Sequence, residues 1–172
     1  MTLFDDSNAH ERPDVIARVL EAEAARVLEH RADKGGVYCR VCRRQATERH
    51  RRFNSEMAVF ICKLVRRWLE EQRWYRNVEI IGSAAKNSTD AAFAVQTGHL
   101  RRTGAGIETD SPKAGAYQPT EMGVQFALGQ PTQTYSHFWT YDGRVTRVDG
   151  DIINVQQALR EKFDWRKLMG NE

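Results

Sequence analysis

The chain has 172 residues, of which 41% are hydrophobic and 28% charged, which is enough for one ordinary domain with a small appended one. No apolar run reaches the roughly 18 residues of a membrane span, and the acidic, polar amino terminus does not have the pattern of a secretory signal. Three cysteines do not make a disulfide framework, so we expect a reducing cytoplasm or a metal site.

The net charge of +3 conceals an uneven distribution along the chain. Residues 1–33 carry a net charge of −4, residues 34–76 carry +8, and residues 77–172 carry −1. Basic residues are therefore concentrated in one quarter of the chain. Such a block indicates a polyanionic partner, with nucleic acid as the first expectation. The alternative is a solvated basic face that the acidic amino-terminal segment partly neutralises.

The first predicted element is a helix over Arg12–Arg31, after an arm over residues 1–12 that we expect to be frayed. Pro13 suits the first turn of a helix, and Gly35-Gly36 ends the segment. The apolar side of this helix is thin because several of its residues are alanine. It can pack on the main helix of the chain or pair with a second copy of itself, which would make a homodimer.

A C-x-x-C turn, Cys39 to Cys42, follows a short strand-like segment. Two thiolates at this spacing can occupy two corners of a tetrahedral Zn²⁺ site, which then needs two further ligands. The candidates are His30, His50 and Cys62, and we expect Cys39, Cys42 and His50 to form the core of the ligand set. Cys62 lies beside an apolar helical stripe and is interpreted as a core residue. The alternatives are a metal-free knuckle and a pair of ordinary thiols.

The central predicted element is the helix Asn54–Gln72. Its apolar residues recur at spacings of three and four and form one continuous stripe: Met57, Phe60, Ile61, Leu64, Val65, Trp68 and Leu69. Asn54 or Ser55 can cap its amino end. We expect this helix to be the centre of the core.

The elements that follow have the order of a winged helix-turn-helix. They are a short strand at Val78–Ile81, a turn at Ser83–Lys86, a helix at Thr89–Arg102, and a hairpin of Ile107–Thr109 with Ala116–Gln118. In this interpretation Thr89–Arg102 is the recognition helix and the hairpin is the wing.

Three further elements are predicted towards the carboxyl terminus. Thr120 caps a short helix, and Asp142-Gly143 marks a hairpin between Tyr135–Tyr141 and Arg144–Val148. Asn154 and Gln157 form a capping box for a helix over Val155–Lys162, and Asp164 starts a last turn. The predicted fold class is α+β, a winged helix-turn-helix-like domain with an N-terminal helix and a small C-x-x-C knuckle. The predicted divisions are 1–33, 34–53, 54–130 and 131–172.

Nucleic-acid contacts are predicted from the basic block, from the second helix and from the wing tip. Arginines can neutralise phosphates, and aromatic side chains interleaved with them can stack on unpaired bases. The predicted contact residues are Arg43, Arg44, Arg49, Arg51, Arg52, Arg66, Arg67, Gln96, His99, Arg101, Arg102 and Lys113.

No motif of an enzyme supports catalysis. The sequence contains no P-loop, no G-x-S-x-G and no H-E-x-x-H. We therefore predict a non-enzymatic DNA-binding protein. The alternative is a module that binds another protein.

Several short stretches resemble a family of small, uncharacterised proteins encoded by bacteriophages and prophages. They are the C-x-x-C turn with Arg52-Phe53-Asn54-Ser55-Glu56-Met57-Ala58, then Tyr141-Asp142-Gly143 and Phe163-Asp164-Trp165. The match is weakest at Ser83–Leu100, and Arg43 stands where a glycine follows a zinc knuckle. The resemblance implies a phage setting, the cytoplasm of a bacterial host and a non-enzymatic role. In that setting we predict nucleic-acid binding in gene regulation or DNA metabolism, or, as the alternative, binding of a host or phage protein.

Overall fold

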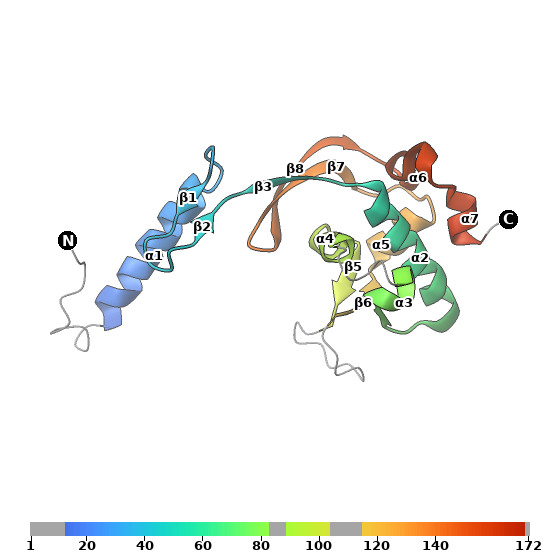
Figure 1. Ribbon diagram of the computed structural model, residues 1–172, viewed down its shortest axis with the longest axis horizontal. Coiled ribbons are helices and arrows are strands. Elements are labelled where there is room, and N and C mark those ends of the chain that lie inside the picture. The colour runs from blue at the N-terminus through green and yellow to red at the C-terminus, as the bar shows by residue number, and fades with distance from the viewer. Residues whose placement is uncertain (1–12, 83–88, 104–114, 171–172) are drawn as a thin grey trace. The chain divides into compact units, whose positions relative to one another are not determined.

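The computed structural model describes residues 13–82, 89–103 and 115–170 (Figure 1). The chain divides into two compact units, Met1–Arg49 (unit 1) and His50–Glu172 (unit 2). Helices and small antiparallel sheets are mixed, which confirms the α+β class, but the described elements do not confirm a winged helix. No helix in the described ranges combines the length and the apolar character needed to cross a bilayer.

Unit 1 consists of one helix and one short hairpin. The helix α1 spans Pro13–His30, close to the predicted bounds. Strand β1 (Val37–Tyr38) pairs antiparallel with β2 (Gln45–Ala46), and the turn between them carries Cys39 and Cys42. Gly36 permits this hairpin, because a Cβ there would lie 2.2 Å from the carbonyl oxygen of Ala46.

Unit 2 is built around α2 (Ser55–Glu71), as the apolar stripe predicts. Asn54 caps the helix by accepting a hydrogen bond of 2.8 Å from the backbone N–H of Met57. The buried residues of α2 are Met57, Ala58, Val59, Phe60, Ile61, Cys62, Leu64 and Val65. Ala58, Val59 and Cys62 lie beside the predicted stripe and are also buried. The helix α2 is therefore covered on more than one side.

Short helices and a strand surround α2. They are α4 (Asp90–Gln96), α5 (Glu121–Ala127), α6 (Val155–Leu159), α7 (Trp165–Met169) and β6 (Ala116–Pro119), and all of them contact α2. The predicted caps are confirmed: Thr120 accepts from the N–H of Gly123, and Asn154 and Gln157 form a capping box. Gly123 lets α5 approach the backbone of His99, because a Cβ at position 123 would lie 2.0 Å from the carbonyl oxygen of His99.

Two three-stranded antiparallel sheets complete unit 2. In one, β6 lies between β4 (Tyr75–Arg76) and β5 (Leu100–Arg102). In the other, β7 (Tyr135–Tyr141) lies between β3 (Arg49–Arg52) and β8 (Arg144–Ile152). The β7–β8 hairpin turns at Asp142-Gly143, where both residues have positive φ, so the hairpin prediction is confirmed.

The predicted strand at Val78–Ile81 is wrong, because Asn77–Ile81 forms the short helix α3. The backbone N–H of Arg76 donates to the carboxylate of Glu79 at 2.7 Å, which is one half of a capping box. This local bond outweighs the preference of Val78 and the two isoleucines for extended backbone.

The predicted helix over Thr89–Arg102 is also wrong in its second half. The helix α4 ends at Gln96, Gly98 has φ of +81°, and the chain continues as strand β5. A glycine in the left-handed region stops a helix, as it does at a C-cap. Arg101 and Arg102 therefore lie on a strand and not on a recognition helix.

Other predicted segments differ in extent or lie outside the described residues. The helix expected over Val155–Lys162 is α6 followed by a 3-10 turn at Arg160–Lys162, where Arg160 has φ of +56°. The strand expected as one arm of the hairpin, Ala116–Gln118, is instead the central strand β6 of a sheet. The arm 1–12, the turn Ser83–Lys86, the segment Ile107–Thr109 and Lys113 lie outside the described residues.

Candidate nucleic-acid interface

The strongest candidate surface is the outer face of the sheet β3–β7–β8. Side chains alternate along each strand, so one face of β7 is buried and the other is not. Phe138 and Thr140 are buried in unit 2, whereas His137 and Trp139 point to the opposite, partly exposed face. The same alternation divides β3: Arg51 lies over the ring of Phe93 at 4.8 Å, on the core side.

Five side chains form a continuous row on this outer face, which we call the sheet face: Arg52, His137, His50, Trp139 and Arg147. The His50 ring lies 5.1 Å from the ring of His137 and 4.7 Å from that of Trp139. The guanidinium of Arg147 lies 4.0 Å from the Trp139 ring, and Nε of Arg52 lies 3.4 Å from Nε2 of His137. Two cations therefore end a row of three rings.

The strand register explains why these residues meet. Trp139 pairs with Arg147 across β7 and β8, and His137 pairs with Asp149. Paired residues of antiparallel strands share a face, so the carboxylate of Asp149 belongs to this surface as well. Gly150 gives the strands their close approach, since a Cβ there would lie 2.3 Å from Oγ of Ser136. The sheet face thus has cationic ends and one acidic neighbour.

A second basic surface is a groove between α2 and α7, which we call the basic groove. Its volume is about 470 Å³, and its lining includes Lys63, Arg66, Arg67 and Lys167, with Glu70 as the acidic member. Arg66 and Arg67 are exposed on the side of α2 that faces away from the core. The groove can neutralise phosphate groups by charge, but it offers no aromatic side chain among the residues that line it.

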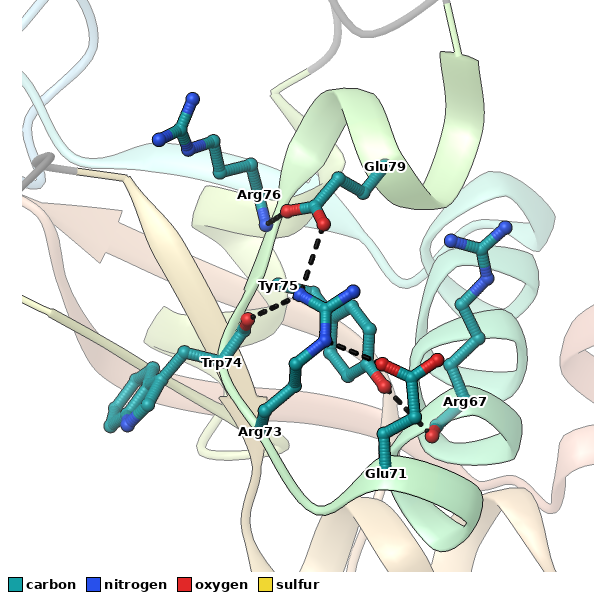
Figure 2. A network of polar contacts seen from close by, with 7 residues as sticks. All are labelled: Arg67, Glu71, Arg73, Trp74, Tyr75, Arg76 and Glu79. Atoms are coloured by element: carbon teal, nitrogen blue, oxygen red, sulfur yellow. Dashed lines mark hydrogen bonds and ion pairs between the residues drawn. The ribbon is translucent and has the colours of Figure 1, made fainter. Parts of the chain in front are cut away.

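A third polar region lies where α2 leads into β4 and α3 (Figure 2). Arg73 donates to Glu79 at 3.0 Å and to the carbonyl oxygen of Trp74 at 3.1 Å, and it also pairs with Glu71. The hydrogen bond from Arg73 lowers the pKa of Glu71 below its usual range. The hydroxyl of Tyr75 donates to the carbonyl oxygen of Arg67 at 2.8 Å. The side chain of Arg73 is thus already paired with neighbouring residues of unit 2.

The cysteine knuckle of unit 1, the turn that contains Cys39 and Cys42, carries two free thiols. The backbone N–H of Cys42 donates to Sγ of Cys39 at 3.5 Å, and this bond is the first of the contacts that lower the pKa of Cys39. Cys62 belongs to unit 2 and is buried, as predicted, and burial raises the pKa of its thiol to about 12.

The predicted ligand set is divided between the two units, with Cys39 and Cys42 in unit 1 and His50 in unit 2. Within the described residues no group of three or more His, Cys, Asp or Glu side chains is placed to hold a metal ion. His50 belongs to unit 2, where its ring packs against His137 and Trp139. The predicted alternative ligand His30 contacts Asp33 at 3.0 Å.

Three of the predicted nucleic-acid contacts are corrected. His99 is only 1% exposed, and its ring nitrogens contact the hydroxyls of Thr97 and Thr134 at 3.0 and 2.8 Å. Burial lowers the pKa of His99 to about 4. Gln96 is partly buried beside the same small cavity, and Arg51 packs on Phe93. His99 therefore belongs to the interior of unit 2, while Gln96, at the end of α4, and Arg51, on β3, are partly buried.

The other predicted contact residues that the structure describes are exposed. Arg43 and Arg44 lie in the knuckle of unit 1, and Arg49 begins β3. On β5, Arg102 is exposed, while Arg101 donates to Gln118 and lies 5.5 Å from the Trp74 ring. Of the predicted set, the structure places Arg52 in the sheet face and Arg66 and Arg67 in the basic groove.

The predicted contact residues did not include His50, His137, Trp139 and Arg147 of the sheet face, or Lys63 and Lys167 of the basic groove. A signal existed in the strand YSHFWTY, whose odd-numbered positions are all aromatic or histidine. That alternation predicts a strand with one aromatic face. It does not predict that His50, from a distant segment, extends the row.

Comparison with protein-family models, with curated proteins and with solved structures finds no match to this chain. The resemblance to phage-encoded proteins therefore stays a prediction from the sequence.

Proposed function

We propose that the protein binds nucleic acid, with the sheet face of unit 2 as the contact for a single-stranded segment. The observation that supports this most directly is the row Arg52–His137–His50–Trp139–Arg147, in which two cations end a row of three rings on one partly exposed sheet surface. Single-stranded nucleic acid offers alternating phosphates and unpaired bases. A surface that presents cations and rings together matches both.

The basic groove supplies further phosphate contacts in this proposal. Lys63, Arg66, Arg67 and Lys167 are opposed by the single carboxylate of Glu70 among the groove's lining residues. Because the groove lacks aromatic residues, we assign it to the backbone of the nucleic acid, without a preference for base or for strandedness. DNA is the nucleic acid of this proposal, and gene regulation or DNA metabolism is the process. The resemblance in sequence implies only the phage setting.

This mode of binding differs from that of a winged helix. In a winged helix the second helix enters the major groove of a duplex. Here α4 ends at Gln96, and the two arginines that follow it lie on β5. We therefore expect single strands to bind more tightly than a duplex of the same length.

The test is the binding of a fluorescein-labelled oligothymidylate to the full chain, followed by anisotropy over a salt series. We expect dissociation constants around the micromolar range at about 50 mM salt, weakening steeply as salt rises. Each phosphate contact contributes about −0.7 to the logarithmic salt slope on a single strand. The variant Arg52→Glu/Arg147→Glu should therefore bind more weakly and with a slope shallower by about 1.4.

The matched control carries the same change of charge on unit 1. Arg18 and Lys34 are exposed there, and Arg18→Glu/Lys34→Glu alters the net charge by the same amount. This control should lose much less affinity than the sheet-face variant. Equal losses would mean that net charge, and not the sheet face, governs binding.

Asp149 provides a test in the opposite direction. Its carboxylate lies across from His137 and repels a polyanion, so Asp149→Asn should increase affinity for the oligonucleotide. Absence of binding by the parent protein at low salt would contradict the proposal altogether. The basic surfaces would then be assigned to an acidic protein partner.

A further inference from the structure

We propose that Cys39 and Cys42 form one half of a zinc site, which the same two cysteines of a second copy of this chain complete. The product is a dimer with one Zn²⁺ held by four sulfurs. This inference concerns unit 1 and does not depend on the nucleic-acid proposal.

The first support is the geometry of the turn that carries the two cysteines. The N–H of Cys42 points at Sγ of Cys39 over 3.5 Å, so one tight turn brings the two residues together. The N–H of Arg43 donates to the carbonyl oxygen of Cys39 at 2.9 Å, and Arg43 has φ of +57°. Glycine is the residue that adopts this backbone most easily, yet here the turn forms with arginine.

The second support is that α1 holds the turn in place. The carboxylate of Glu23 accepts from the backbone N–H of Arg40 at 2.6 Å and binds the guanidinium of Arg26 through both oxygens. Arg26 in turn donates to the carbonyl oxygen of Tyr38 at 2.6 Å. The residues on both sides of Cys39 are thus fixed to one helix, so the pair is preorganised to bind a metal ion.

The third support is that the pair is incomplete as a structural zinc site. Structural Zn²⁺ has four protein ligands in a tetrahedron. Cys39 is partly exposed and Cys42 is exposed, and the described residues of unit 1 bring no third His, Cys, Asp or Glu to them. An identical pair from a second chain supplies the two missing sulfurs with the same geometry, as two-fold symmetry requires.

The fourth support identifies the second copy as the partner. The apolar face of α1 is buried at Val27, in the turns next to β1, but it continues uncovered towards the amino end. There Val15, Ile16, Val19 and Leu20 are each 42–50% exposed. They precede Glu23, the residue that fixes the knuckle, by one to two helical turns. Two α1 helices packed along this face would bury it beside two facing knuckles.

The test measures zinc content and mass on the same sample of reduced, full-length protein. We expect about one zinc per two chains and a dimer by native mass spectrometry and sedimentation, with both lost in Cys39→Ser/Cys42→Ser. Substitution by Co²⁺ should give the thiolate-to-metal absorption of four sulfurs per ion. Cys62→Ala is the control thiol change and should retain zinc and dimer.

The apolar face is tested separately by Val19→Ser/Leu20→Ser, which should raise the dissociation constant of the dimer at least tenfold. Tryptophan fluorescence shows whether each variant keeps unit 2 folded, since all four tryptophans follow residue 50. One zinc per monomer, a disulfide between Cys39 and Cys42 in place of metal, or a dimer that persists without zinc would each overturn the proposal.

Discussion

The helices α1 and α2 have nearly the same length and a similar apolar periodicity, but their apolar faces differ in burial. In α2, Met57, Ile61 and Leu64 are completely buried. In α1, Ile16, Val19 and Leu20 remain about half exposed, although they recur at the same helical spacing. Periodicity therefore identifies which face of a helix is apolar and can pack against another apolar surface. Whether that face is buried depends on which other elements of the chain pack against it.

The largest effect should separate two identical substitutions, Leu64→Ala on α2 and Leu20→Ala on α1. Leu64 has no exposed surface, so its truncation leaves a cavity and should cost about 2–5 kcal/mol of unfolding free energy. Leu20 is 47% exposed in a single chain, so in the zinc-free monomer its truncation should cost less than about 0.5 kcal/mol. Urea unfolding measures both losses with two probes: tryptophan emission reports on unit 2, which contains Leu64, and helical circular dichroism also follows α1, which contains Leu20. Similar losses would remove the distinction between the two helices.

The buried histidine of unit 2 should make its stability depend on pH. Folded His99 has a pKa of about 4, against 6.5 as its ordinary value. Above pH 6.5 the imidazole is neutral in both states, and stability is unaffected. As pH falls from 6.5 to 4, the unfolded chain takes up the proton first, so unfolding becomes easier by on the order of 3 kcal/mol.

The variant His99→Gln tests this pH dependence. It should be less stable than the parent at pH 7, because it disturbs the contacts with Thr97 and Thr134. Its unfolding free energy should nevertheless vary less between pH 6.5 and pH 4. Urea midpoints across this range measure the difference, and parallel curves for the two proteins would contradict the assignment to His99.

The caps of the core helices should give an intermediate effect. Asn54→Ala removes the bond to the N–H of Met57 and the contact of 3.3 Å with Asp90, and should cost about 1 kcal/mol. Asn54→Asp keeps an acceptor at the same position and serves as the control. Loss of the same size in both variants would show that the amide contact with Asp90, and not the cap, is responsible.

The smallest effect is expected at Arg73, despite its several contacts in Figure 2. Its side chain is 46% exposed, and exposed ion pairs contribute little after solvent screening. Arg73→Gln should change the unfolding free energy by less than about 1 kcal/mol. Repeating the measurement in high salt is informative, because the difference between variant and parent should shrink further. A large, salt-independent loss would place Arg73 in the core energetics of unit 2.

Local features of the fold could be predicted from the sequence because they depend on residues close in the chain. Asn54 and Thr120 cap the helices that follow them, and Asp142-Gly143 forms the turn of its hairpin. Two predicted elements of unit 2 were wrong: the strand at Val78–Ile81 and the second half of the helix Thr89–Arg102. In both, a local feature outweighed the secondary-structure propensity of the residues. A carboxylate at Glu79 favoured a helix, and Gly98 ended one early.

The candidate surfaces depended on tertiary structure to a greater extent. By itself the sequence determined where basic charge is concentrated, which helix forms the core and where the two cysteines lie. Only the packing of distant strands decided that His50 joins Trp139 and Arg147, and that Arg51 turns towards Phe93 while Arg52 does not. The physical reason is that alternation assigns neighbours on a strand to opposite faces, whereas the position of the core decides which face is buried.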